Sequence, residues 1–155
     1  MDPDIDFEAV FAQFDTFIMG RRTFEVAGTG GGSSASGGKT FVFSRTLRRE
    51  DHPHFTIIPD VSPATVDPTR AQAVKDIWLF GGGELFRSFL DAGLVDTVEV
   101  AVIPVLLGDG LPLLPHPARH AKLTLTGHRI YETGIVLLDY GVKGESSRMA
   151  PRLRG

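Results

Sequence analysis

The sequence contains no cysteine. This absence excludes disulfide bonds, thiolate metal sites and cysteine nucleophiles. Basic residues are not in excess, because 16 Lys and Arg stand against 19 Asp and Glu and give a net charge of −3. No apolar run reaches transmembrane length, and the acidic first residues are unlike a signal peptide. We therefore expect a cytoplasmic protein that binds neither nucleic acid nor a membrane.

The patterns of a metal centre and of a serine hydrolase are also absent. A metal site needs imidazoles or carboxylates that converge on rigid elements. The five histidines show no such spacing, and there is no Gly-x-Ser-x-Gly motif. We expect no metal. The chain has 155 residues, of which 42% are apolar and 23% charged, and this is typical of one globular domain.

The most informative stretch is Asp76–Asp96. The apolar run Ile77–Phe80 predicts a strand buried on both faces, and three glycines follow it. Apolar residues then recur at helical spacing, namely Leu85, Phe86, Phe89 and Leu90. A strand, a glycine turn and a helix would present free N–H groups and the positive end of the helix dipole to a phosphate. The alternative is a tight turn that only requires positive φ.

Two other predicted strands end in groups that suit a phosphate. Thr16–Met19 leads into Gly-Arg-Arg-Thr, and Thr40–Phe43 leads into Ser-Arg-Thr. Arginine forks match phosphate oxygens in a bidentate manner. The alternative is that these segments are solvated basic turns.

The rest of the chain predicts further short elements. Phe7, Val10, Phe11 and Phe14 mark one face of a helix, whose first turn is acidic. The other expected elements are strand Phe55–Ile58, helix Thr69–Lys75, strand Thr97–Leu107 with a break at Pro104, and a hairpin of Gly127–Glu132 with Ile135–Tyr140. Gly28–Gly38 reads as a flexible loop. We expect one domain over residues 1–143 and a disordered tail over 144–155.

The order of the motifs resembles that of a known superfamily. The motifs are Met19-Gly-Arg-Arg-Thr-Phe-Glu25, Val42-Phe-Ser-Arg-Thr-Leu47, Leu79-Phe-Gly-Gly-Gly-Glu-Leu-Phe86 and Pro104-Val-Leu-Leu-Gly-Asp-Gly110. Together with the C-terminal hairpin, they resemble the dihydrofolate reductase-like superfamily. Within this superfamily, the sequence most resembles a bacterial branch. This branch contains the reductase domain of the bifunctional riboflavin-biosynthesis deaminase–reductase. The resemblance implies an α/β fold with a central mixed sheet flanked by helices, and NADPH as the cofactor.

The resemblance also implies roles for residues at the three strand ends. The Gly-Arg-x-Thr turn would hold the cofactor phosphates, and the Ser-Arg pair would face the adenosine 2′-phosphate. The glycine turn would pack against the pyrophosphate and the nicotinamide, with a cis peptide expected at Gly81–Gly82. The cofactor-binding residues implied in this way are Gly20, Arg21, Arg22, Thr23, Ser44, Arg45, Gly81, Gly82, Gly83, Glu84 and Leu85.

The chain departs from the family pattern at its N-terminus. Family members begin with a central strand that contributes to the nicotinamide and substrate pockets, and this strand is expected to be missing here. A misassigned start codon, a shortened family member and a truncated chain all remain open. By spacing from Gly20, the acidic substrate-binding residue of the family maps to Asp4, with Asp6 and Glu8 as rivals. Helix capping is the alternative role for these three carboxylates.

The resulting hypothesis is an NADPH-dependent reductase of the 5-amino-6-(5-phosphoribosylamino)uracil reductase type. It would transfer a hydride to a heterocyclic or ribosylaminopyrimidine substrate. A non-catalytic nucleotide-binding or oligomerising module and a true dihydrofolate reductase are the alternatives. The long apolar strand Val98–Leu107 also gives a homodimer as an expectation, because an uncovered sheet edge invites pairing.

Overall fold

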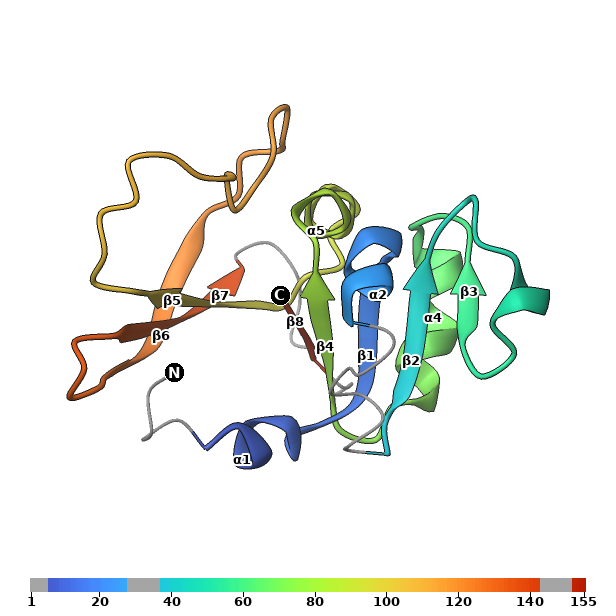
Figure 1. Ribbon diagram of the computed structural model, residues 1–155, viewed down its shortest axis with the longest axis horizontal. Helices are drawn as coiled ribbons and strands as arrows, with labels where there is room; N and C mark the ends of the chain where they lie inside the picture. Colours follow the sequence, from blue (N-terminus) through green and yellow to red (C-terminus); the bar gives the residue numbers. More distant parts are fainter. Residues whose placement is uncertain (1–5, 28–36, 143–151) are drawn as a thin grey trace.

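The computed structural model describes residues 6–27, 37–142 and 152–155. Within these ranges one mixed sheet has eight strands in the order β3-β2-β1-β4-β8-β5-β7-β6. Parallel pairing runs from β3 to β5, whereas β7 pairs antiparallel with both β5 and β6 (Figure 1). The strands are β1 Phe14–Gly20, β2 Lys39–Phe43, β3 Thr56–Ile58, β4 Asp76–Gly81, β5 Thr97–Val102, β6 Leu123–Ile130, β7 Val136–Val142 and β8 Leu153–Arg154. The predicted α/β fold with a central mixed sheet and a C-terminal hairpin is confirmed.

Helices α4 (Pro63–Gln72) and α5 (Gly83–Asp91) cover one face of the parallel part of the sheet. Val66 of α4 and Phe89 of α5 are fully buried there against Ile18, Ile77 and other sheet residues. Burying side chains of this size stabilises the fold by about 1.5–3 kcal/mol each. This packing holds the start of α5 directly beyond the end of β4.

Helices α1 (Phe7–Phe11) and α2 (Arg21–Ala27) pack on the opposite face. Trp78 lies at the centre of an aromatic cluster there, with its ring 5.2 Å from Phe11 and 5.0 Å from Phe14. Phe24 of α2 is buried against Met19 and its neighbours. The prediction that Phe14 belongs to the first helix is wrong, because α1 ends at Phe11 and Phe14 begins β1.

Local side-chain bonds explain where two of these elements begin. Ser62 forms a capping box with Thr65 and Pro63 occupies the first turn, so α4 begins well before the predicted Thr69. The carboxylate of Asp15 accepts hydrogen bonds from the backbone N–H groups of Val74 (2.8 Å) and Lys75 (3.0 Å) at the entry to β4. Partial burial opposes ionisation of Asp15, but these bonds outweigh it and lower the pKa of the carboxyl group.

The C-terminal residues correct the prediction of a disordered tail. Leu153 is fully buried in the core, and β8 lies in the centre of the sheet between β4 and β5. The sheet therefore has a central strand where the resemblance implied a missing one. The tail prediction is wrong for residues 152–155, and 143–151 lie outside the described residues, as does most of the glycine-rich loop.

The strands β5, β7 and β6 form the other half of the sheet, at the left of Figure 1. The turn Tyr131–Ile135 joins β6 and β7 as the predicted hairpin, closed by a 2.9 Å bond from the backbone N of Tyr131 to the carbonyl of Ile135. β5 ends at Val102, so the predicted strand to Leu107 is too long. Pro104 has no backbone N–H group and cannot donate a hydrogen bond to a neighbouring strand, which is consistent with the end of β5 two residues before it.

Candidate functional site

The carboxyl ends of β1, β2 and β4 meet at one edge of the sheet. β1 pairs in parallel with both β2 and β4, so the loops that leave these strands emerge side by side. Ligands of open parallel sheets bind beyond such carboxyl ends. The three motifs singled out in the sequence are these loops, although they lie far apart along the chain.

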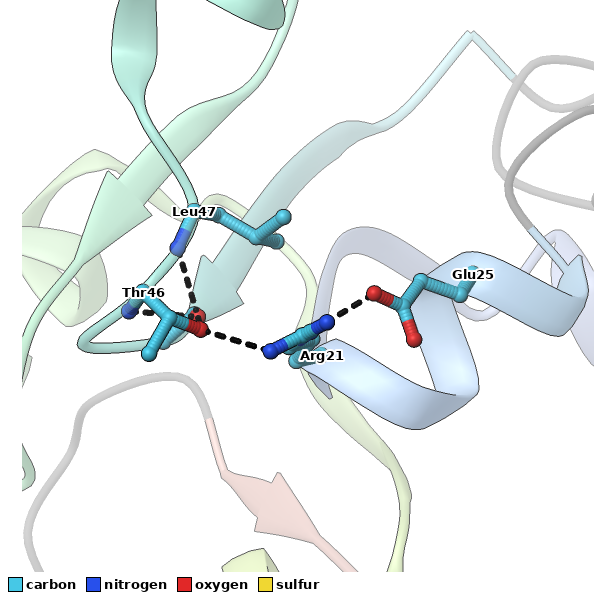
Figure 2. A network of polar contacts seen from close by, with 5 residues as sticks. Arg21, Glu25, Thr46 and Leu47 are labelled. Carbon is cyan, nitrogen blue, oxygen red and sulfur yellow. Dashed lines mark hydrogen bonds and ion pairs between the residues drawn. The ribbon is translucent and has the colours of Figure 1, made fainter.

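Arg21 links the first loop to the second (Figure 2). Its Nη1 donates a hydrogen bond of 2.9 Å to Oγ1 of Thr46, and its Nε pairs with Glu25 at 2.6 Å. Ser44 Oγ in turn accepts bonds from the backbone N–H groups of Thr46 and Leu47, at 3.2 and 3.1 Å. A guanidinium and two hydroxyl groups are thus held together at the ends of β1 and β2.

The glycine turn lies on the other side of Gly20. A Cβ atom at Gly20 would lie 3.8 Å from the carbonyl oxygen of Gly81 and 3.8 Å from Cβ of Leu85. Thr23 Oγ1 would lie 3.6 Å from a Cβ at Gly82. The Gly81–Gly82 peptide is cis, as the resemblance led us to expect, and Gly81 has φ of +123°. The glycines thus allow the end of β1 and this turn to pack closely, and they leave the backbone of the turn without side chains.

Helix α5 begins at this turn without a side-chain cap. Gly82 is its N-cap residue and makes no side-chain hydrogen bond, so the first N–H groups of the helix keep their capacity to bind an anion. The carboxylate of Glu84, in the first turn of α5, forms an ion pair of 2.7 Å with Arg87, and this pair offsets the negative charge of Glu84. A Cβ at Gly83 would meet Pro115 at 3.0 Å, so Gly83 is needed for packing against the long β5–β6 loop.

The remaining predicted residues contribute less definite contacts. Arg22 and Arg45 are exposed at the same edge, and neither has an acidic partner within the part of the chain that the structure describes. Asp4 lies outside the described residues. Asp6 caps α1 by accepting a 2.9 Å bond from the backbone N of Ala9, which confirms the capping alternative for this residue.

Thr46 is a contact that sequence reasoning did not assign to the site. It was visible only as one hydroxyl of the Ser-Arg-Thr run, and its bond to Arg21 spans 25 residues. The pattern that would have indicated it is a serine followed two residues later by a threonine in a turn, where hydroxyls bond to nearby backbone. The structure thus places the hydroxyl of Thr46 against Arg21.

A separate hollow lies at the opposite edge of the sheet. It has a volume of about 360 Å³ and is lined by residues that include Lys39, His54 and Gln72. These residues lie near the amino ends of β2 and β3, away from the three loops. No helix in the described ranges is long and apolar enough to cross a membrane.

The fold defines an α/β protein of the dihydrofolate reductase-like class. Residues 3–137 match the RibD C-terminal domain, so the chain belongs to this family of reductase-like domains. It is 31% identical over 156 residues to YyaP of Bacillus subtilis (strain 168), a match that covers 93% of this chain and 82% of YyaP. The family confirms the resemblance seen in the sequence.

Two solved structures share the fold. A protein of Shewanella sp. PV-4 named after riboflavin biosynthesis has a TM-score of 0.75 at 19% identity, over 92% of this chain and 82% of that one. The diaminohydroxyphosphoribosylaminopyrimidine deaminase/5-amino-6-(5-phosphoribosylamino)uracil reductase of Thermotoga maritima has a TM-score of 0.63 at 14% identity. The match covers 89% of this chain and 48% of the Thermotoga chain.

Proposed function

We propose that this chain is an NADPH-dependent reductase that holds the phosphates of its cofactor at the edge formed by β1, β2 and β4. The observation that supports this proposal most directly is the convergence of three loops at this edge. Arg21 bonds to Thr46 at 2.9 Å, and Gly20 packs against the Gly81–Gly82 turn. A dinucleotide with a pyrophosphate and a further phosphate requires suitable groups at more than one place, and these loops offer them.

The residues present fit such a cofactor. The glycine turn and the uncapped start of α5 would hold the pyrophosphate through backbone N–H groups. Ser44 and Arg45 at the end of β2 would hold the 2′-phosphate, since an exposed guanidinium without an acidic partner among the described residues keeps its forked donors available. When bound, NADPH supplies the hydride, and the chain binds and orients the cofactor.

The substrate class that we propose is a ribosylaminopyrimidine. The reductase activity in the name of the Thermotoga relative supports this choice, together with membership of the RibD C-terminal domain family. The reaction would oxidise NADPH to NADP⁺ and add a hydride and a proton to the substrate.

Binding is tested by titrating the folded protein with NADPH while nicotinamide fluorescence is followed. We expect saturable binding in the micromolar range. A folded sample that shows no binding at high micromolar NADPH would refute the cofactor assignment.

Turnover is tested separately by the loss of NADPH absorbance in the presence of 5-amino-6-(5-phosphoribosylamino)uracil, with dihydrofolate as a second substrate. Oxidation with the ribosylaminopyrimidine supports the proposal. Binding without any turnover would favour a non-catalytic nucleotide-binding module, and turnover only with dihydrofolate would favour a dihydrofolate reductase.

A further inference from the structure

Residues 113–119 of the loop between β5 and β6 lie along helix α5. At the start of the helix, a Cβ atom at Gly83 would lie 3.0 Å from Pro115, so the helix and the loop are in close contact. At the end of the helix, the backbone N–H of Arg119 donates a hydrogen bond of 3.1 Å to Oδ1 of Asp91. This segment, which we call the strap, is therefore attached near both ends of α5.

Arg87 attaches the middle of the strap to the helix. Its Nη1 donates a hydrogen bond of 3.2 Å to the carbonyl oxygen of Pro117, and its Nη2 forms the 2.7 Å ion pair with Oε2 of Glu84. The side chain of Arg87 is only 25% exposed. A guanidinium is a planar fork of donors, so it can fix two partners relative to each other. The strap therefore controls where Arg87 holds the Glu84 carboxylate.

Glu84 places a negative charge in the first turn of the helix at which we propose that phosphates bind. It directly follows Gly83, and the helix has no side-chain cap. An acidic side chain in the first turn is attracted to the positive end of the helix dipole, so it competes with a phosphate for the same N–H groups. Among the described residues, Arg87 is the only partner of this carboxylate. Since Arg87 lies three residues further along, the pair draws the carboxylate away from the start of the helix.

An ordinary surface ion pair is the alternative explanation of this contact. Exposed pairs contribute little to stability, because water screens the charges and long side chains lose freedom. Arg87 differs from such a residue in two respects, namely its low exposure and its second bond to the strap. These observations favour a role in which Arg87 determines the position of Glu84 over one in which it only adds stability.

We propose that Arg87 is a positioning residue of the phosphate site at the start of α5. It holds the Glu84 carboxylate toward the second turn of the helix and neutralises its charge, so that the first N–H groups bind the cofactor pyrophosphate. The strap takes part because its Pro117 carbonyl orients Arg87. This role rests on the proposed function, since NADPH is the anion concerned.

The test is fluorescence titration of the full chain with NADPH, for wild type and for the variants Arg87→Met and E84Q/R87M. Arg87→Met should weaken binding about two- to five-fold, the effect of one charge at a helix terminus. The double variant should bind as wild type does, because no carboxylate remains to be held back. The loss in Arg87→Met relative to wild type should also shrink as salt rises from about 0.05 to 0.5 M, since salt screens exposed charges. A purely structural role would show neither the restoration nor this dependence on salt.

Two further variants separate the charge of Glu84 from other effects. E84Q keeps Arg87 and should bind NADPH at least as tightly as wild type, whether or not Arg87→Met folds. Arg119→Met removes a positive charge from the strap at the other end of α5. The side chain of Arg119 forms no ion pair among the described residues, so this variant should bind NADPH as wild type does.

The outcomes distinguish this role from the cofactor assignment. If wild type binds NADPH and Arg87→Met binds it equally well, the positioning role alone is overturned. Weakening in Arg87→Met that E84Q/R87M does not reverse, weaker binding by E84Q, or an equal loss in Arg119→Met would also overturn it. A folded wild-type protein that binds no NADPH would overturn both the role and the cofactor assignment.

Discussion

Arg45 is the residue on which the choice between NADPH and NADH depends in the proposed function. It is exposed after β2, next to the Ser44 and Thr46 hydroxyls. Arg45→Ala should weaken the binding of NADPH by roughly 1.5–3 kcal/mol, which is the contribution of a charge-assisted hydrogen bond. The binding of NADH should remain nearly unchanged, because NADH has no 2′-phosphate. Fluorescence titration with both cofactors measures the difference. Arg48→Ala, at another exposed arginine of the same loop, is the control, and equal weakening of both cofactors would reject the 2′-phosphate role.

Glu99 carries a pH-dependent contribution to stability. It lies directly opposite Asp139 across β5 and β7. Partial burial raises the pKa of Glu99, and a hydrogen bond and repulsion from Asp139 add to this, whereas Arg154 and Arg129 oppose it. Because the folded state holds the proton more tightly than the unfolded state, the stabilisation is present at low pH and is lost as pH rises through the raised pKa.

Glu99→Gln should remove this pH dependence. Above the raised pKa the variant should be more stable than wild type by about 0.2–1 kcal/mol. The value is small because Glu99, although partly buried, keeps substantial contact with solvent, which screens the repulsion between like charges. Urea unfolding between pH 4 and 8 is the measurement. Glu132→Gln, in the exposed β6–β7 turn, should follow the wild-type profile. A wild-type curve that rises over this window relative to Glu99→Gln would contradict the assignment.

At the residue scale, the sequence predicted the types of the site residues better than their contacts. The hydroxyls and guanidiniums at the strand ends were recognisable, because the apolar runs before them mark where strands stop. The bond between Arg21 and Thr46 depends on the register of β1 against β2, and no local pattern encodes that register. The cofactor-binding roles of all the strand-end residues, and the substrate-binding role of Asp4, stay predictions.

At the scale of elements, β8 shows the limit of pattern reading. A strand of two residues is too short to show a periodic pattern, and the segment before it is charged and polar. The ordered conformation of β8 depends on contacts with residues elsewhere in the chain. The backbone N of Leu153 donates to Asp96 at 2.8 Å, and Arg154 pairs with Asp76 at 3.0 Å. Contacts that span 57 to 78 residues cannot be seen in a local window.

The same contacts predict that β8 contributes strongly to stability. Leu153 is fully buried among core residues such as Ile77 and Phe89. Leu153→Ala should lower the free energy of unfolding by about 2–5 kcal/mol, through lost transfer energy and the cavity left behind. Urea denaturation measures this change. Val74→Ala, at a side chain that is 88% exposed, should change it by less than about 0.5 kcal/mol. Similar effects of the two substitutions would show that β8 is not docked in solution.

At the scale of the whole molecule, the order of the elements was predictable and the arrangement of the layers was not. Motif order alone led to the correct superfamily, since each strand-end motif follows a recognisable apolar run. Composition gave no indication that one half of the sheet would be packed by helices on both faces and that the other half would not. That asymmetry depends on where α4 and α5 pack, which only the three-dimensional contacts show.

Cofactor binding should stabilise the whole domain, because a ligand that binds only the folded state shifts the unfolding equilibrium. At a free NADPH concentration one hundred times its dissociation constant, the gain is about 2.7 kcal/mol. For a domain of this size, such a gain corresponds to a rise in Tm of roughly 5–10 °C. Thermal unfolding with and without NADPH measures the rise. The Val74→Ala variant should show the same rise, because Val74 lies just before the amino end of β4, away from the three loops. An unchanged wild-type Tm at saturating NADPH would contradict the proposed site.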